Sequence, residues 1–139
     1  MNIELLKKVK TPEETASIVY EILKSDGIDV VLSGGSCMEI YTNSNYSSYD
    51  LDFIANPTIK TEQVTKAMIN AGFEKMKNRY FKHPDNDYLV EFPTGPVSLG
   101  HEEPKIHNEL KTQVGTLKLL TPTNCVKDRL CAYLYHNGE

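Results

Sequence analysis

The sequence IDVVLSGGS at residues 28–36 decides the fold, together with YDLDFI at residues 49–54. The β-branched run at 28–32 predicts a mostly buried strand, and the glycines and serine after it predict a turn into a short helix. The second stretch alternates apolar with acidic or polar residues, which predicts a strand with two different faces. Two strands joined through a glycine turn and a short helix are therefore expected.

Two carboxylates share one face of the second predicted strand. Residues i and i+2 of a strand point the same way, so Asp50 and Asp52 project together about 6.6 Å apart. Like charges placed so closely repel each other, and a divalent cation such as Mg²⁺ removes that conflict. Glu91 lies between apolar residues of a later predicted strand, with Asp87 as a competitor for the same role. If that strand lies beside the first, three carboxylates converge, as a two-metal site requires.

The glycine turn supplies the features of a phosphate site. Gly34 and Gly35 let the backbone approach a phosphate closely, and the helix that follows offers N–H donors and the positive end of its dipole. The hydroxyl of Ser36 adds one more donor. A phosphate site next to an acidic strand fits metal-dependent phosphoryl transfer.

The rest of the chain predicts helices packed on a mixed sheet. Thr11, Pro12 and Glu14 form the start of a helix over 12–25. A second helix is expected over 61–71, a strand over 73–77, a hairpin over 79–92 around a turn at 84–87, and a hairpin over 110–120 around Gly115. An irregular stretch over 93–108 separates the two hairpins. A last helix begins at Pro122 and runs to about 135. This order predicts an α+β protein whose mixed β-sheet is flanked by helices.

Composition limits the class of protein. The 139 residues (15.7 kDa) predict a single domain over 1–139, and the net charge of −4 disfavours a protein that coats nucleic acid. No apolar stretch is long enough to span a bilayer and no signal peptide begins the chain, so we expect a cytoplasmic protein without a membrane partner. Cys37, Cys125 and Cys131 are expected to be reduced thiols.

At Gly34-Gly35-Ser36, Asp50, Asp52 and Glu91 the sequence resembles the DNA polymerase β-like nucleotidyltransferase superfamily. The resemblance covers about residues 12–136 and is nearest to the small bacterial branch of abortive-infection nucleotidyltransferase toxins and their antitoxin relatives. It implies a polymerase β palm-like fold. In that branch a late helix begins near a proline and carries a lysine, similar to Lys127 after Pro122. Larger relatives continue into a helical domain, whereas this sequence stops at Glu139.

The resemblance implies a nucleotidyltransferase that moves a nucleoside monophosphate from a nucleoside triphosphate, such as ATP, to an acceptor hydroxyl. Asp50, Asp52 and Glu91 would hold Mg²⁺ or Mn²⁺ and carry the catalysis. Gly34, Gly35, Ser36 and Lys127 would bind the nucleotide phosphates. The acceptor stays open between an RNA end, a protein hydroxyl and a small molecule.

Two other functions compete with this one. A non-catalytic member of the fold would be a binding module, such as an antitoxin or assembly subunit, and a metal-dependent phosphohydrolase would use the same carboxylates with water. The last helix carries Val126 and Leu130 on one apolar stripe with Tyr133 and Leu134, which leaves a homodimer or a helical partner protein as candidates to cover it. The basic segment from Lys75 to Lys82, with Tyr80 inside it, fits either substrate guidance or a lysine-protected sheet edge.

Overall fold

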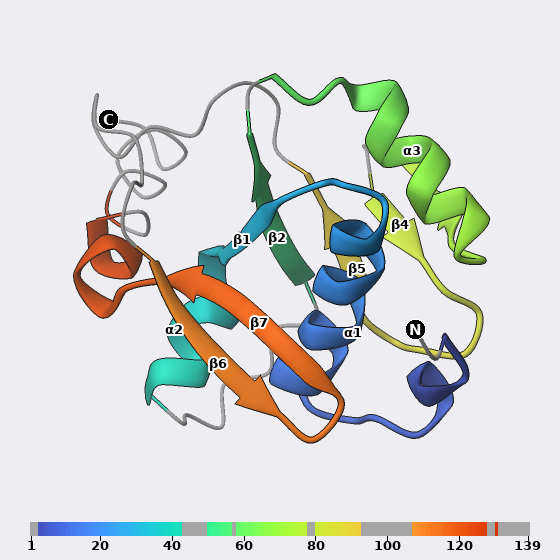
Figure 1. The fold of residues 1–139 in the computed structure, drawn as a ribbon. Coiled ribbons are helices and arrows are strands. Elements are labelled where there is room, and N and C mark those ends of the chain that lie inside the picture. The colour runs from blue at the N-terminus through green and yellow to red at the C-terminus, as the bar shows by residue number, and fades with distance from the viewer. Residues whose placement is uncertain are drawn as a thin grey trace.

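The computed structural model describes residues 3–42, 50–56, 58–77, 80–92, 107–127 and 130. Its strands form one seven-stranded mixed sheet in the order β3-β4-β5-β2-β1-β7-β6 (Figure 1). The strands are β1 (Val30–Ser33), β2 (Asp50–Ala55), β3 (Glu74–Lys75), β4 (Tyr80–Lys82), β5 (Leu89–Glu91), β6 (His107–Thr112) and β7 (Gly115–Leu120). The helices are η1 (Ile3–Lys7, a 3-10 helix), α1 (Pro12–Ser25), α2 (Gly34–Thr42) and α3 (Thr61–Asn70), with a further helical segment over 122–127.

The centre of the sheet consists of the two strands that the sequence singles out. β1 and β2 are antiparallel neighbours, with Ser33 opposite Asp52, and β2 pairs in parallel with β5 on its other side. β1 pairs in parallel with β7, so the sheet is mixed, as predicted. The α+β class with helices against a mixed sheet is confirmed.

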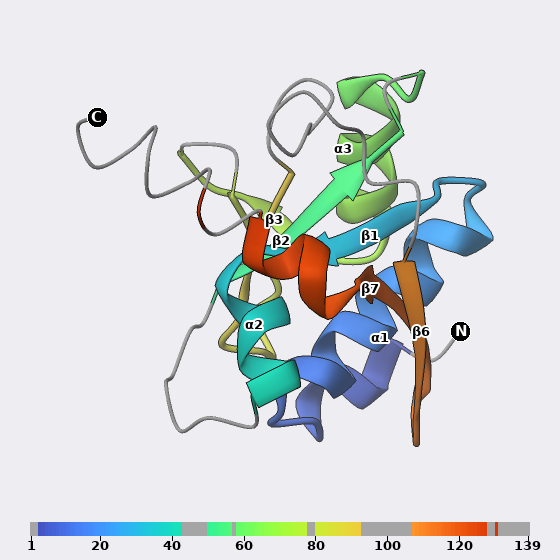
Figure 2. The same cartoon turned by 90° about the vertical axis from the view of Figure 1, so that its left-hand side faces the viewer.

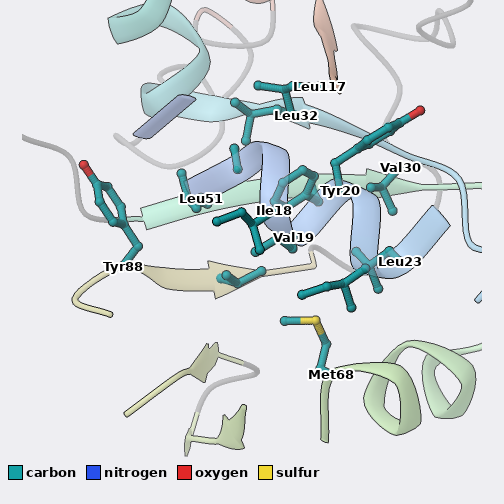
Figure 3. Close-up of a cluster of buried hydrophobic side chains, with 14 of the residues drawn as sticks. Ile18, Val19, Tyr20, Leu23, Val30, Leu32, Leu51, Met68, Tyr88 and Leu117 are labelled. Carbon is teal, nitrogen blue, oxygen red and sulfur yellow. The ribbon is translucent and has the colours of Figure 1, made fainter. Parts of the chain in front are cut away.

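α1 contributes more buried hydrophobic side chains to the core than any other described element. Its start has the predicted N-cap: Thr11 Oγ1 accepts from the Glu14 amide at 3.2 Å, and Pro12 occupies the first turn. The Glu14 carboxylate accepts from the Thr11 hydroxyl at 2.9 Å, so the second half of a capping box, a bond to the Thr11 backbone, is not the contact seen. Ile18, Val19 and Leu23 are buried against Leu32, Leu51 and Leu117 of the sheet and Met68 of α3 (Figure 3). Each such side chain contributes about 1.5–3 kcal/mol of transfer free energy, so this face holds the sheet and helices together.

Several boundaries differ from the predictions. β1 begins at Val30 instead of residue 28, β3 is only two residues long, and Gln113 and Val114 form the turn of the last hairpin while Gly115 already belongs to β7. The last helix is seen from residue 122 to 127 and at Leu130, and most of the irregular stretch over 93–108, together with Cys131, Tyr133 and Leu134, lies outside the described residues. Cys37 and Cys125 are buried thiols, as expected.

α2 lies beside α1 at the end of β1, and β6 forms the outer edge of the sheet (Figure 2). Two side chains of α2 contact the same backbone carbonyl at the end of β7. Tyr41 donates its hydroxyl to Leu120 O at 2.6 Å, and Cys37 Sγ lies 3.8 Å from that oxygen. β1, α2 and the end of β7 are thereby held in one unit.

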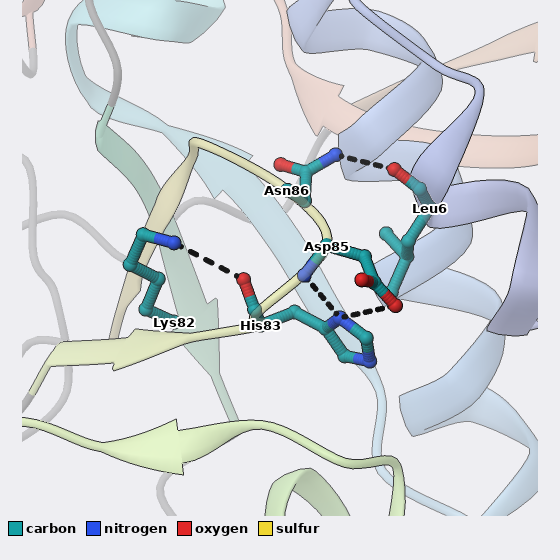
Figure 4. A network of polar contacts seen from close by, with 5 residues as sticks. All are labelled: Leu6, Lys82, His83, Asp85 and Asn86. Atoms are coloured by element: carbon teal, nitrogen blue, oxygen red, sulfur yellow. Dashed lines mark hydrogen bonds and ion pairs between the residues drawn. The ribbon is translucent and has the colours of Figure 1, made fainter.

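The turn between β4 and β5 is fastened to the beginning of the chain (Figure 4). Asn86 donates to Leu6 O at 3.1 Å and accepts from the Tyr88 amide at 2.9 Å. His83 is buried under this turn, where its Nδ1 accepts from the Asp85 amide at 3.1 Å and its ring meets the edge of Phe73. The neutral imidazole is therefore part of the packing.

Burial lowers the pKa of His83, with smaller contributions of the same sign from Lys82 and Lys7 and an opposing one from Asp85. The unfolded chain consequently takes up a proton at this site before the folded chain does. The His83 contribution to the free energy of unfolding is complete above the unfolded pKa of about 6.5 and is lost as the pH falls below it toward the lowered folded value.

We therefore expect stability to decrease between pH 7.5 and 5.5, by up to about 1.4 kcal/mol per pH unit for one proton. His83→Gln should be less stable at neutral pH but should show a flatter dependence, because the titrating group is gone. Urea unfolding at several pH values measures both slopes. Equal slopes for the two proteins would show that other groups cause the dependence.

Candidate active site

A row of polar side chains crosses four adjacent strands. Tyr80 on β4 is opposite Glu91 on β5, Glu91 is opposite Asp52 on β2, and Asp52 is opposite Ser33 on β1. Residues directly opposite each other in a sheet point to the same face, with their Cβ atoms about 4.5–5.5 Å apart in antiparallel pairs. The predicted adjacency of the Glu91 strand and the Asp52 strand is present.

The acidic residues of β2 lie on the face opposite the core. Leu51 and Phe53 are fully buried, whereas the residues that alternate with them, Asp50 and Asp52, are half-buried. The alternation of β2 therefore places both carboxylates on one face, as its sequence predicts. Glu91 is half-buried on the same face, whereas Asp87 lies before the start of β5 and is exposed.

Gly34 brings the start of α2 against the Asp52 carboxylate. Its φ of +73° lies in the left-handed region, which favours glycine. A methyl group built on Gly34 would overlap Oδ2 of Asp52 and lie 3.1 Å from its Cβ and Cγ. The glycine turn and the acidic strand, recognised separately in the sequence, are thus in direct contact.

Two serine hydroxyls hold the backbone of β2. Ser36 Oγ donates to Asp50 O at 2.5 Å, and Ser33 Oγ donates to Asp52 O at 3.2 Å. Ser36 is fully buried, so its observed role is to fix α2 to β2, and its contact with a phosphate stays a prediction. The carbonyls of both acidic residues are therefore anchored from the neighbouring strand and helix.

The N-terminus of α2 lies against the Asp52 carboxylate, so an anion at this end of the helix needs a cation beside it to offset that charge. The first turn, from Gly34, carries no acidic side chain, and Gly35 is half-buried there. Lys127 is half-buried in the helical segment over 122–127. Its phosphate-binding role stays a prediction.

The donor chemistry of the acidic face fits a hard divalent cation, because carboxylate oxygens are the ligands that Mg²⁺ prefers. Asp50, Asp52 and Glu91 share a face, and Oδ1 of Asp52 is a buried atom. Within the described ranges, however, no three His, Cys, Asp or Glu side chains are arranged to hold an ion as they stand. The expected convergence of the three carboxylates at one point is therefore not seen. Their strands are adjacent and their side chains share one face, as the prediction of a metal site requires.

Tyr80 belongs to this site, although the basic segment around it indicated only substrate guidance or a protected sheet edge. The pKa of the Tyr80 phenol is raised most by the charge of Glu91, then by burial and by the charges of Asp50 and Asp52. The turn at 84–87 could have revealed the position, because a hairpin centred between residues 85 and 86 pairs residue 80 with residue 91. Tyr80 thus reports the field of all three acidic residues.

Comparison with known proteins identifies the fold. No protein-family model matches the sequence, and none of the curated proteins is significantly similar to it. The crystal structure of an antigenic nucleotidyltransferase-like protein from Paracoccidioides brasiliensis is similar over 98% of this chain and 69% of that chain, with a TM-score of 0.64 and 16% identity. The chain therefore has a nucleotidyltransferase-like fold, and at this identity the likeness establishes the fold alone.

The same comparison leaves the resemblance to the toxin and antitoxin branch a prediction.

Across the residues that the structure describes, no helix combines the length and apolar character needed to cross a membrane.

The clustering of the acidic residues can be tested through Tyr80. Glu91→Gln should lower the pKa of the Tyr80 phenol, because it removes the largest of the charges that raise it. The measurement is the phenolate absorbance during a pH titration, taken as the difference from the same protein carrying Tyr80→Phe. Asp87→Asn is the matched control and should leave the Tyr80 pKa unchanged. An unchanged Tyr80 pKa in Glu91→Gln would show that the Glu91 carboxylate does not lie near the Tyr80 phenol.

The contact between Gly34 and Asp52 predicts an unusual sensitivity to a methyl group. Gly27→Ala is the control, since Gly27 also has positive φ (+77°) but has no atom within 4 Å of the position that its methyl group would take. It should cost about 1–2 kcal/mol, the cost of left-handed backbone, whereas Gly34→Ala should cost about 1–3 kcal/mol more because of overpacking. Chemical denaturation measures both, and Asp52→Ala combined with Gly34→Ala should recover part of the difference. Equal costs for the two alanines would contradict the contact.

Proposed function

We propose that this protein is a metal-dependent nucleotidyltransferase that moves a nucleoside monophosphate from a nucleoside triphosphate to an acceptor hydroxyl. The observation that carries the proposal is the direct contact of the glycine turn at Gly34 with Asp52, which in turn lies opposite Glu91. In this proposal the glycine turn and the acidic row act on one substrate. The nucleotidyltransferase-like fold supports the general class.

In this proposal the acidic face binds the cation. Asp50 and Asp52 of β2 would hold Mg²⁺ or Mn²⁺, and Glu91 of β5 would complete the donor set after modest side-chain rotation. The bound ion supplies charge neutralisation for the triphosphate and the developing negative charge. The backbone of β2 needs no movement for this, because Ser33 and Ser36 already anchor it.

The residues of the chain would divide the remaining tasks. Gly34 and Gly35 at the start of α2 would bind the phosphates through the backbone and the helix dipole, with Lys127 as a further cation. Glu91 would accept the proton of the acceptor hydroxyl as the new phosphate ester forms and pyrophosphate leaves. Positioning the acceptor in line with the leaving group, together with charge neutralisation, accounts for most of the acceleration in such a reaction.

The proposal is tested by ligand-induced stabilisation. At about ten times the dissociation constant, Mg²⁺ with a nucleoside triphosphate should stabilise the fold by about 1.4 kcal/mol. This raises the melting temperature by about 3–6 °C for a domain of this size, and each ligand alone should do less. Thermal unfolding with ATP, GTP, CTP and UTP in turn measures the shift.

Asp52→Asn keeps the shape of the side chain and removes its charge, so it should fold yet lose the shift and all nucleotidyl transfer. Asp87→Asn, an exposed residue outside the row, is the matched control and should retain both. If none of the four nucleotides stabilises the unaltered protein, the catalytic proposal fails and the non-catalytic binding module is favoured.

A further inference from the structure

The sheet has one long edge, and it is β6. The strand runs over six residues, His107–Thr112, and pairs with β7 on one side only among the described strands. The opposite edge, β3, is only two residues long. An edge strand leaves alternate N–H and C=O groups pointing away from the sheet, so a long edge offers a template for another strand.

The side chains at the middle of β6 are self-complementary in charge. Glu109 and Lys111 are exposed, lie on the same face, and flank the half-buried Leu110. When two copies of one strand pair antiparallel about a twofold axis perpendicular to the sheet, residues of equal parity lie opposite each other. Pairing centred on Leu110 then places Glu109 opposite Lys111 of the second copy, twice by symmetry.

Neighbouring registers are disfavoured by the same charges. Centring on Glu109 places two glutamates opposite each other, and centring on Lys111 does the same with two lysines, which is destabilising. Within its own chain Glu109 lies opposite Lys118, but the Lys118 ammonium contacts Asp29 at 3.1 Å. The charge pattern thus selects one register and one kind of partner.

We propose that β6 is a homodimer interface in which a second copy of this chain adds its own β6 antiparallel, centred on Leu110. The two sheets then continue into one another through the β6 edges. Because the twofold axis is perpendicular to the sheet, both acidic faces lie on the same side of the combined sheet. This interface uses none of the residues assigned to the candidate active site, so it does not depend on the proposed function.

Charge exchange tests the interface. The unaltered protein should show a concentration-dependent dimer in sedimentation velocity or light scattering, and Lys111→Glu and Glu109→Lys should each raise the dimer dissociation constant about tenfold or more. The double variant Glu109→Lys with Lys111→Glu should restore dimerisation. An equimolar mixture of the two single variants should form a heterodimer, because each then carries one sign of charge. Circular dichroism verifies that every variant is folded.

Glu74→Lys on the opposite edge is the matched control and should leave dimerisation unchanged. A strictly monomeric unaltered protein across the concentration series would overturn the proposal. Dimers of undiminished affinity in both single variants would also overturn it and would direct attention to other surfaces, such as the one around Val126 and Leu130, which are 48% and 56% exposed.

Discussion

The absence of a side chain at Gly34 is the constraint on which the rest of this structure depends. β1 must end, the chain must reverse into α2, and β2 must pass close enough for Asp52 to reach the turn. Only a residue that accepts positive φ and has no Cβ meets all three conditions. The two serines of the same segment then use their hydroxyls to hold β2 in place, so one short stretch determines both the central strand pair and the position of the acidic face.

The sheet is covered by helices on one face and carries acidic residues on the other. Because successive side chains of a strand point to opposite faces, β2 serves both faces: Leu51 and Phe53 point to the core, and Asp50 and Asp52 point away from it. This division keeps the like charges out of the apolar core, where the cost of burying them would be large. It also lets one six-residue strand serve stability and chemistry at the same time.

Local signals were sufficient for much of this arrangement. The capping residues gave the limits of the first long helix, alternation gave the face shared by Asp50 and Asp52, and the turn at 84–87 gave the hairpin that carries Glu91. Long-range contacts were not available in the same way. The inward-pointing hydroxyl of Ser36 depends on how closely α2 approaches β2, and the approach of Glu91 to Asp52 depends on the pairing of β5 with β2. The orientation of each carboxylate depends on side-chain rotation, which no sequence pattern specifies.

The attachment of Asn86 to Leu6 links the first residues of the chain to the acidic face. Glu91 is carried by a hairpin whose turn is held by η1 and whose strand β5 pairs with both β4 and β2. Cooperative units of this kind open together, because the loss of one anchor frees the whole element. η1 and the β4–β5 hairpin should therefore exchange their amide protons as one unit, so that the third carboxylate is as well ordered as the N-terminal turn to which its hairpin is attached.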